Sequence, residues 1–341
     1  MRRIGVSLLV MAVTFVAAWA APAPPAGGVQ PQVEIIKPRP FSEKKDPPIK
    51  ITWRTDLDAA AEEAARTGRL VLAFFYAEWS QPCKWMDEGT FGSRPVAGFM
   101  VRNFIPVKID DSGDTSAVSR RFQIRVYPTL LFLDAARRPL HMVLGPRPPD
   151  KLYPLLKEVA ALPGLIDAQK KAPDDLEANF AIGNAFAKLN QLRRGEPYLK
   201  RAAALAPKNE NGRLSQARLI LAAVPLEDGD SALAMENIVA YLKEFKDAPE
   251  VPVAIFYQGT ILFQDGKLEE SRGYFEQVRQ RFPKHPKAYD ADKAIESIDA
   301  RLKAKAAQQN AGPKAAPQDP GSKAASKPPA PAPVPAKKPV G

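Results

Sequence analysis

The stretch that decides the fold is residues 70–86, which read L-V-L-A-F-F-Y-A-E-W-S-Q-P-C-K-W-M. Seven apolar or aromatic residues from Leu70 to Tyr76 follow one another without a break, a pattern typical of a strand buried on both faces. A short polar turn, residues 79–82, comes next, and Cys83 then begins the first turn of a helix. The stretch therefore predicts a strand that runs into a helix N-terminus.

A thiol in the first turn of a helix has two interpretations. The positive end of the helix dipole and the unpaired backbone N–H groups favour the thiolate at Cys83, which would make it reactive. Burial favours the neutral thiol, which would make Cys83 an inert part of the core. Both interpretations stay open at this point.

Residues 77–84, A-E-W-S-Q-P-C-K, resemble the active-site turn of thioredoxin, W-C-G-P-C-K, with Ser80 in place of the first cysteine. Further on, V-Y-P-T at residues 126–129 resembles the family's second hallmark, a proline with a cis bond that opens a strand facing the turn. The resemblance implies a cis bond before Pro128 and a peptide groove shaped by Trp79, Pro82 and Pro128. The alternative is a trans proline at a strand start.

The chain departs from the family in two ways. In the family the first cysteine is the nucleophile and the second resolves the mixed disulfide, and only the second is kept here, as Cys83. It cannot run a dithiol–disulfide cycle by itself. Phe74 stands where thioredoxins usually carry a buried aspartate. Ser80 would need a base beside it to act as a nucleophile, and His141 is far away in the sequence.

The N-terminal region predicts export. Met1-Arg2-Arg3, an uncharged apolar stretch at residues 4–17 and Ala18-Trp19-Ala20 predict a signal peptide over residues 1–20, cut after Ala20. An uncleaved membrane anchor is the alternative. A proline-rich linker follows at residues 21–48. The protein is therefore expected in a bacterial periplasm or secreted, where a lone cysteine can form only mixed or intermolecular disulfides.

Residues 49–162 are predicted to form one thioredoxin-like domain, an α/β/α sandwich. Asp56 is expected to cap the first helix and Gly68 to end it. The expected helices cover residues 57–67, the segments beginning at 83 and 93, 114–122 and 150–161. The expected strands cover residues 70–76, 104–109, 128–133 and 140–144, with a short additional strand at 49–53. The domain looks most like those of exported bacterial thiol reductases.

Residues 163–302 predict an all-α array of tetratricopeptide-like repeats. Pro173 and Pro207 are separated by the 34-residue period of that family, and so are Pro249 and Pro283. We expect about three repeats, of which the middle one is irregular, with residues 165–171 as part of an earlier repeat and 288–302 as a capping helix. Such stacks usually hold an extended peptide or a partner protein.

Residues 303–341 are rich in lysine, alanine and proline and are expected to be disordered. Much of the net charge of +11 lies in this tail, which argues against a folded nucleic-acid-binding face. A solvated end and a contact with anionic lipid or cell-wall polymer are both compatible with it.

The remaining chemistry is sparse. His141 and His285 stand alone, so no metal site is predicted, and nothing indicates a cofactor. Asp110, Asp111 and Asp114 are expected to cap a helix or face solvent rather than bind calcium.

Two hypotheses about function follow from the sequence. The favoured one is a protein-binding adaptor in the bacterial envelope that binds an exported protein or peptide. The alternative is a monothiol oxidoreductase that uses Cys83, so whether the chain is an enzyme stays open. In either case Trp79 could stack on a bound peptide, although packing is the other interpretation for Trp79 and Trp85.

Overall fold

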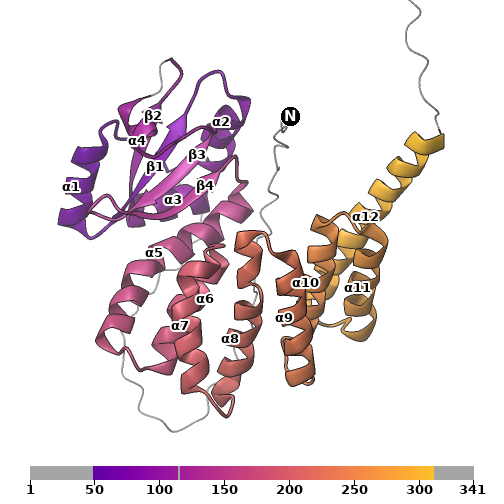
Figure 1. The fold of residues 1–341 in the computed structure, drawn as a ribbon. Coiled ribbons are helices and arrows are strands. Elements are labelled where there is room, and N and C mark those ends of the chain that lie inside the picture. The colour runs from indigo at the N-terminus through magenta and orange to yellow at the C-terminus, as the bar shows by residue number, and fades with distance from the viewer. Residues whose placement is uncertain (1–48, 114–115, 311–341) are drawn as a thin grey trace, which may run out of the picture.

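The computed structural model describes residues 49–113 and 116–310, which form a sheet flanked by helices and then a row of helices (Figure 1). The predicted signal peptide and linker, residues 1–48, lie outside the described residues, as does the tail from residue 311. Within the described ranges, no helix is both long and apolar enough to cross a membrane.

The sheet has four strands in the order β2-β1-β3-β4. β1 (Leu70–Tyr76) pairs in parallel with β2 (Phe104–Asp110) and antiparallel with β3 (Thr129–Leu133). β4 (Pro139–Leu144) pairs antiparallel with β3 and lies at the edge. β1 is buried on both faces because helices cover both sides of the sheet, and this explains its unbroken apolar sequence.

Two apolar cores lie on the two faces of the sheet. On one face α1 (Leu57–Thr67) places a stripe of buried leucine and alanine against Val71 and Val107. Asp56 caps this helix and Gly68 ends it with a φ of 67°, as the sequence predicts. The larger core on the other face lies under three helices and a π-helical turn, which are α2 (Gln81–Trp85), η1 (Met86–Thr90), α3 (Arg94–Asn103) and α5 (Pro149–Lys171).

Two expectations at the edges of this region are wrong. Residues 49–53 form no strand, and only a bridge between Arg54 and Val107 joins this segment to β2. The helix expected over residues 114–122 is the shorter α4 (Ala117–Arg121), whose N-cap is Ser116.

The break expected between residues 161 and 165 does not exist. One continuous helix, α5, covers both of the segments predicted there, with Pro154 and Pro163 inside it. Its buried residues, Leu152, Leu156, Val159 and Leu162, recur every three or four positions and hold one face of the helix in the core. This burial outweighs the cost of the two prolines. The domain boundary predicted at residue 162 therefore falls within a helix.

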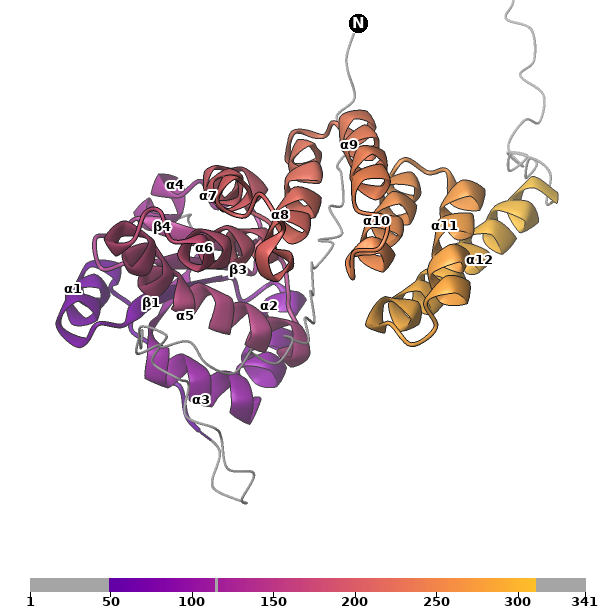
Figure 2. The ribbon, with the colours of Figure 1, turned by 90° about the horizontal axis from the view of Figure 1, so that it is seen from below.

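The row of helices consists of three pairs and a final helix, and the predicted fold class is confirmed. Figures 1 and 2 show the helices side by side from α6 to α12, with the sheet at one end of the row. The pairs are α6 (Leu176–Lys188) with α7 (Leu192–Leu205), α8 (Arg213–Ala222) with α9 (Ser231–Glu244), and α10 (Val251–Gln264) with α11 (Leu268–Arg281).

The irregular middle pair contains two short 3₁₀ turns, η2 (Glu210–Gly212) and η3 (Val224–Asp228), which accommodate the inserted residues. The last helix, α12 (Pro286–Asn310), extends beyond the predicted end at residue 302, so residues 303–310 of the predicted tail are helical.

Glycines sit where paired helices come closest. A Cβ atom on Gly195 would lie 2.7 Å from the backbone oxygen of Gly183, so α6 and α7 approach backbone to backbone. In the third pair, a Cβ atom on Gly259 would lie 2.9 Å from the Phe275 ring. These glycines are packing positions, because a side chain there would collide with the neighbouring helix.

Candidate functional site

The turn that resembles the thioredoxin active site lies between the end of β1 and α2. The backbone oxygen of Ser80 accepts hydrogen bonds from the N–H groups of Cys83 (3.0 Å) and Lys84 (3.3 Å), which starts the helix. Pro82 fits in the first turn of α2 because N–H groups there have no partner within the helix. Trp79 lies outside the helix and is 68% exposed.

Cys83 is fully buried, with 0% of its surface exposed, and belongs to the larger core. It is a free thiol. A reagent in solvent can reach it only if α2 moves, so the inert interpretation describes this conformation better than the reactive one.

The loop before β3 faces the turn. The bond between Tyr127 and Pro128 is cis, as predicted, and Pro128 is buried. The Ser80 hydroxyl donates to the Tyr127 carbonyl oxygen at 3.3 Å. The rings of Trp79 and Tyr127 meet edge to face with 5.7 Å between their centroids. The structure therefore brings together Trp79, Ser80 and the residues around Pro128, which lie far apart in the sequence.

A buried carboxylate, that of Asp111, accepts hydrogen bonds from this loop and from the start of α4. Asp111, which is 3% exposed, accepts hydrogen bonds from the backbone N–H of Ser116 at 2.7 Å and from the Ser119 hydroxyl. It also accepts one from the Tyr127 hydroxyl at 3.1 Å. Asp111 thus holds Ser116, the N-cap of α4, rather than capping the helix itself, and in addition anchors Tyr127. The sequence did not indicate this second contact, because it joins segments 16 residues apart.

Phe74, which the resemblance to thioredoxin places at the position of a buried aspartate, lies in the core. Its ring is fully buried and packs against Trp53 and Phe91, with centroid distances of 5.7 and 5.0 Å. Lys108, its partner in the register of β2, places its ammonium 4.0 Å from the centroid of the Tyr76 ring and 2.6 Å from Asp87 Oδ2. The Phe74 ring and the ion pair between Lys108 and Asp87 therefore occupy the region beside the turn.

His141 does not supply a base to Ser80. The Ser80 hydroxyl is bonded to the Tyr127 carbonyl, and the His141 ring contacts Gln191 at the start of α7. Hydroxyl nucleophilic catalysis thus has no support in this geometry.

Exposed apolar side chains occur on the turn, on the helix after it and on the segments around Pro128. Trp79, Trp85 and Val126 lie on the turn, on α2 and before Pro128, and Leu144 ends β4 beside the start of β3. Exposed apolar groups of this kind are typical of binding surfaces. Sequence analysis identified Trp79 here but missed Val126 and Leu144, since their exposure depends on how the strands end.

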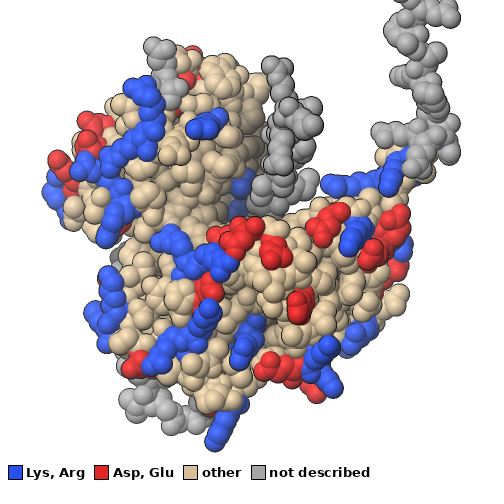
Figure 3. All heavy atoms as spheres, viewed as in Figure 1, with Lys and Arg blue, Asp and Glu red and all other residues tan. Residues whose placement is uncertain are grey.

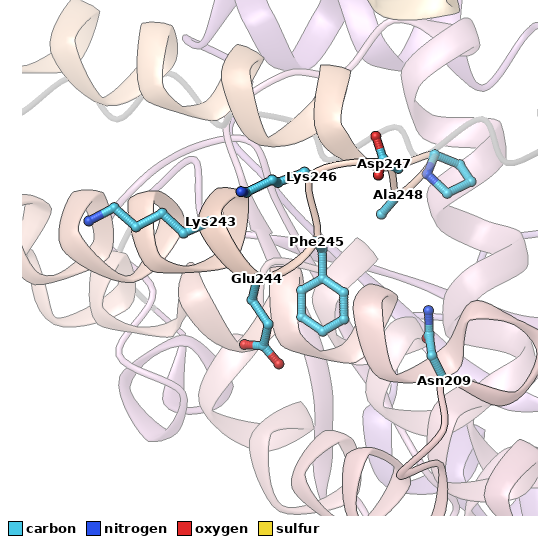
Figure 4. Close-up of a pocket in the computed structure, with 8 residues that line it drawn as sticks. Asn209, Lys243, Glu244, Phe245, Lys246, Asp247 and Ala248 are labelled. Carbon is cyan, nitrogen blue, oxygen red and sulfur yellow. The ribbon is translucent and has the colours of Figure 1, made fainter.

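A separate hollow lies at the turn between α9 and α10 (Figure 4). Its lining consists of Asn209 and residues 243–249. Lys243, Glu244 and Asp247 point in different directions in the close-up, so their charges do not converge on one point. Across residues 49–113 and 116–310, no three histidine, cysteine or acidic side chains are grouped to hold a metal ion.

Comparison with known proteins matches residues 52–135 to a family described as thioredoxin-like. The sheet order, the turn before α2 and this match together define that region as a thioredoxin-like domain. The thiol:disulfide interchange protein DsbD of Ralstonia nicotianae is 32% identical over 84 residues, which cover 24% of this chain. The chain spans only 14% of the length of that relative.

Several solved structures are similar to parts of the chain. A thioredoxin from Thermus thermophilus is 20% identical, with a TM-score of 0.32, and the match covers 36% of this chain and 98% of that one. The C-terminal domain of DsbD from Neisseria meningitidis is 23% identical, with a TM-score of 0.28 and coverages of 31% and 98%. A putative kinesin light chain of Podosopora anserina, with TPR-like repeats, is 16% identical, with a TM-score of 0.34 and coverages of 45% and 82%.

Proposed function

We propose that this chain is an exported adaptor of the bacterial envelope that binds a partner protein and does not catalyse dithiol–disulfide exchange. The observation that carries the proposal is the set of residues at the turn between β1 and α2 and the burial of its one cysteine. Ser80 replaces one cysteine, Cys83 is fully buried, and Phe74 occupies the place of a proton-transferring acid. A thioredoxin-like domain of this kind keeps the shape of a peptide-binding domain without its redox pair.

The binding surface we propose has two parts. Trp79 and its exposed apolar neighbours offer flat area near the turn, with the buried Pro128 behind them. The helix pairs add a second surface, and repeats of this type are generally protein-interaction modules. We place the mature protein in the periplasm or outside the cell, with the signal peptide removed. Fractionation of cells that express the full chain tests this location.

The central test is reduction of insulin disulfides by the mature protein in the presence of dithiothreitol. We expect no acceleration over dithiothreitol alone. Ser80→Cys is the matched comparison, because it restores the pair at the same turn. Catalytic turnover by the unaltered protein would overturn the proposal.

A monothiol oxidoreductase is the second candidate, and two observations favour it. Cys83 lies in the first turn of α2 beside the exposed Trp79, and the curated relative is named a thiol:disulfide interchange protein. In this mechanism Cys83 would attack a disulfide of the partner. One partner sulfur would join Cys83 in a mixed disulfide, the other would leave as a thiol, and a second thiol compound would later release the partner.

Covalent complexes decide between the two candidates. Exported proteins would be trapped by acid quenching and separated without reducing agent. The monothiol candidate requires complexes that disappear in Cys83→Ser. Complexes absent from the unaltered protein, or unchanged in Cys83→Ser, leave the adaptor as the explanation.

A further inference from the structure

The first helix pair shares an apolar core with the thioredoxin-like sheet, and α6 packs against α5. Ile182, Phe186 and Leu189 of this part belong to the same core as Leu140 and Val143 of β4. Lys188 of α6 also forms an ion pair with Glu158 of α5 at 2.9 Å. Figure 3 shows basic and acidic side chains gathered along the line where the two parts of the chain meet. These contacts therefore fix the orientation of the helix array relative to the sheet.

Polar contacts close the edge of β4. The backbone oxygen of Leu140 accepts hydrogen bonds from Gln191 Nε2 at 3.0 Å and from Arg194 Nη1 at 2.7 Å. Both donors come from the beginning of the second helix of the pair. They satisfy an edge carbonyl that a further strand would otherwise be free to use.

The orientation of the Gln191 amide follows from its neighbours. Arg194 has only donors, and its Nη1 lies 2.7 Å from Gln191 Oε1. Gln191 Nε2 therefore faces His141, where it lies 2.7 Å from Nδ1. Because an amide nitrogen only donates, Nδ1 of His141 must accept. The contact requires a neutral ring with its proton on Nε2.

The surroundings of the ring also oppose a positive charge. His141 packs against the Phe132 ring, with 6.1 Å between centroids. Burial, together with Arg194 of α7 and Arg147 after β4, lowers the pKa of His141 from 6.5 to about 4. Both charged groups that act on the ring are cations, one from each side of the contact.

We propose that the contact of His141 with Gln191 and Arg194 is an acid-sensitive joint that, together with the shared apolar core, holds the repeat array on the edge of the thioredoxin-like sheet. A proton on Nδ1 would place two donors against each other and add a charge beside two arginines. The hydrogen bond then breaks and the array gains freedom relative to the sheet. The inference goes beyond the proposed function and holds whichever partner the protein binds.

The first test is a titration of the histidine rings by NMR in the full mature chain. The chain has two histidines, so His285→Gln assigns the signals. We expect His141 to keep the Nε2–H tautomer down to pH 5. Gln191→Glu supplies an acceptor for the protonated ring and should raise the pKa of His141 by more than one unit. Titration of His141 near 6.5 in the unaltered protein would overturn the proposal.

The second test measures the joint itself. Spin labels on Glu62→Cys in α1 and Glu270→Cys in α11, in a Cys83→Ser background, report the distance between the two parts by pulsed electron resonance. We expect a narrow distribution at pH 7 that broadens at pH 4, while circular dichroism shows the helices intact. With Gln191→Glu the distribution should stay narrow at pH 4.

The control separates this contact from general acid effects. His285→Gln should broaden at pH 4 as the unaltered protein does. A distribution that does not change at pH 4, or one that broadens equally in Gln191→Glu, contradicts the acid-sensitive joint.

Discussion

The closest approach of α6 and α7 leads to a prediction about Gly195. A methyl group there would lie 2.7 Å from the Gly183 oxygen and 3.2 Å from Phe186 Cβ. Ordinary contacts begin near 3.4 Å, so the two helices must separate by several tenths of an ångström. Overpacking of this kind costs about 1–3 kcal/mol. Alanine also gains about 1 kcal/mol over glycine in a helix, which partly offsets the cost.

Gly273 provides the matched control. It also lies inside a helix, α11, but no heavy atom lies within 4 Å of the position its Cβ would occupy. Gly273→Ala should therefore show only the helix-propensity gain of about 1 kcal/mol. Because both variants share that gain, Gly195→Ala should be less stable than Gly273→Ala by about 1–3 kcal/mol.

Urea unfolding followed by circular dichroism measures this difference. The free energy of unfolding of the unaltered protein should lie between those of the two variants or close to one of them. If Gly195→Ala proves as stable as Gly273→Ala, then α6 and α7 are not packed backbone to backbone. The assignment of Gly195 to the closest contact between these two helices would then fail.

Four further predictions follow from the buried and polar groups. Alkylation of Cys83 at neutral pH should be at least about 100-fold slower in the folded protein than in urea, because the thiol is fully buried; equal rates would show that it is accessible. Ser80→Cys should form a disulfide with Cys83 under mild oxidation, detected by loss of two free thiols, whereas two persistent thiols would mean that the turn differs from that of thioredoxin. The pKa of His141 is lower in the folded chain, about 4 against 6.5, so the unfolded chain binds more protons between these values. The contribution of His141 to the free energy of unfolding should be fully present above pH 6.5 and fall by up to about 3 kcal/mol as the pH drops towards 4. His141→Gln should remove this part of the pH dependence, and an unchanged dependence of the unfolding free energy on pH would contradict the prediction. Within the described residues Glu250 Oε1 is buried without a hydrogen-bond partner, so Glu250→Gln should cost less stability than Glu250→Ala, by about 1 kcal/mol or more in urea unfolding, and equal losses would refute this.

Elements with a strong local pattern could be predicted from the sequence. The central strand β1 and the cis bond before Pro128 lie where their motifs predict, and the helix after the turn begins at Gln81, two residues before the predicted start at Cys83. The prolines 34 residues apart marked helix pairs whose glycines do pack at the contacts. The prediction failed at α5, where separate helices were expected over residues 150–161 and 165–171, because the burial of one helix face keeps the helix continuous through Pro163.

The candidate site was only partly predictable. Sequence comparison within the turn located Cys83 and Trp79, but both interpretations of the thiol were compatible with the helix start. Exposure separated the two residues, since Cys83 is enclosed by the core and Trp79 projects from it. The link from Tyr127 to Asp111 required the end of β2 and the loop before β3 to meet.

By itself, the sequence determined the class of each part and the presence of a single cysteine, because these depend on residue identity and on spacing within single segments. Only the tertiary structure decided that Cys83 is buried and that His141 faces Gln191 across 50 residues of sequence. Such facts depend on which faces meet when distant segments pack, and a local pattern of apolar and polar residues contains no information about the partner of a given side chain.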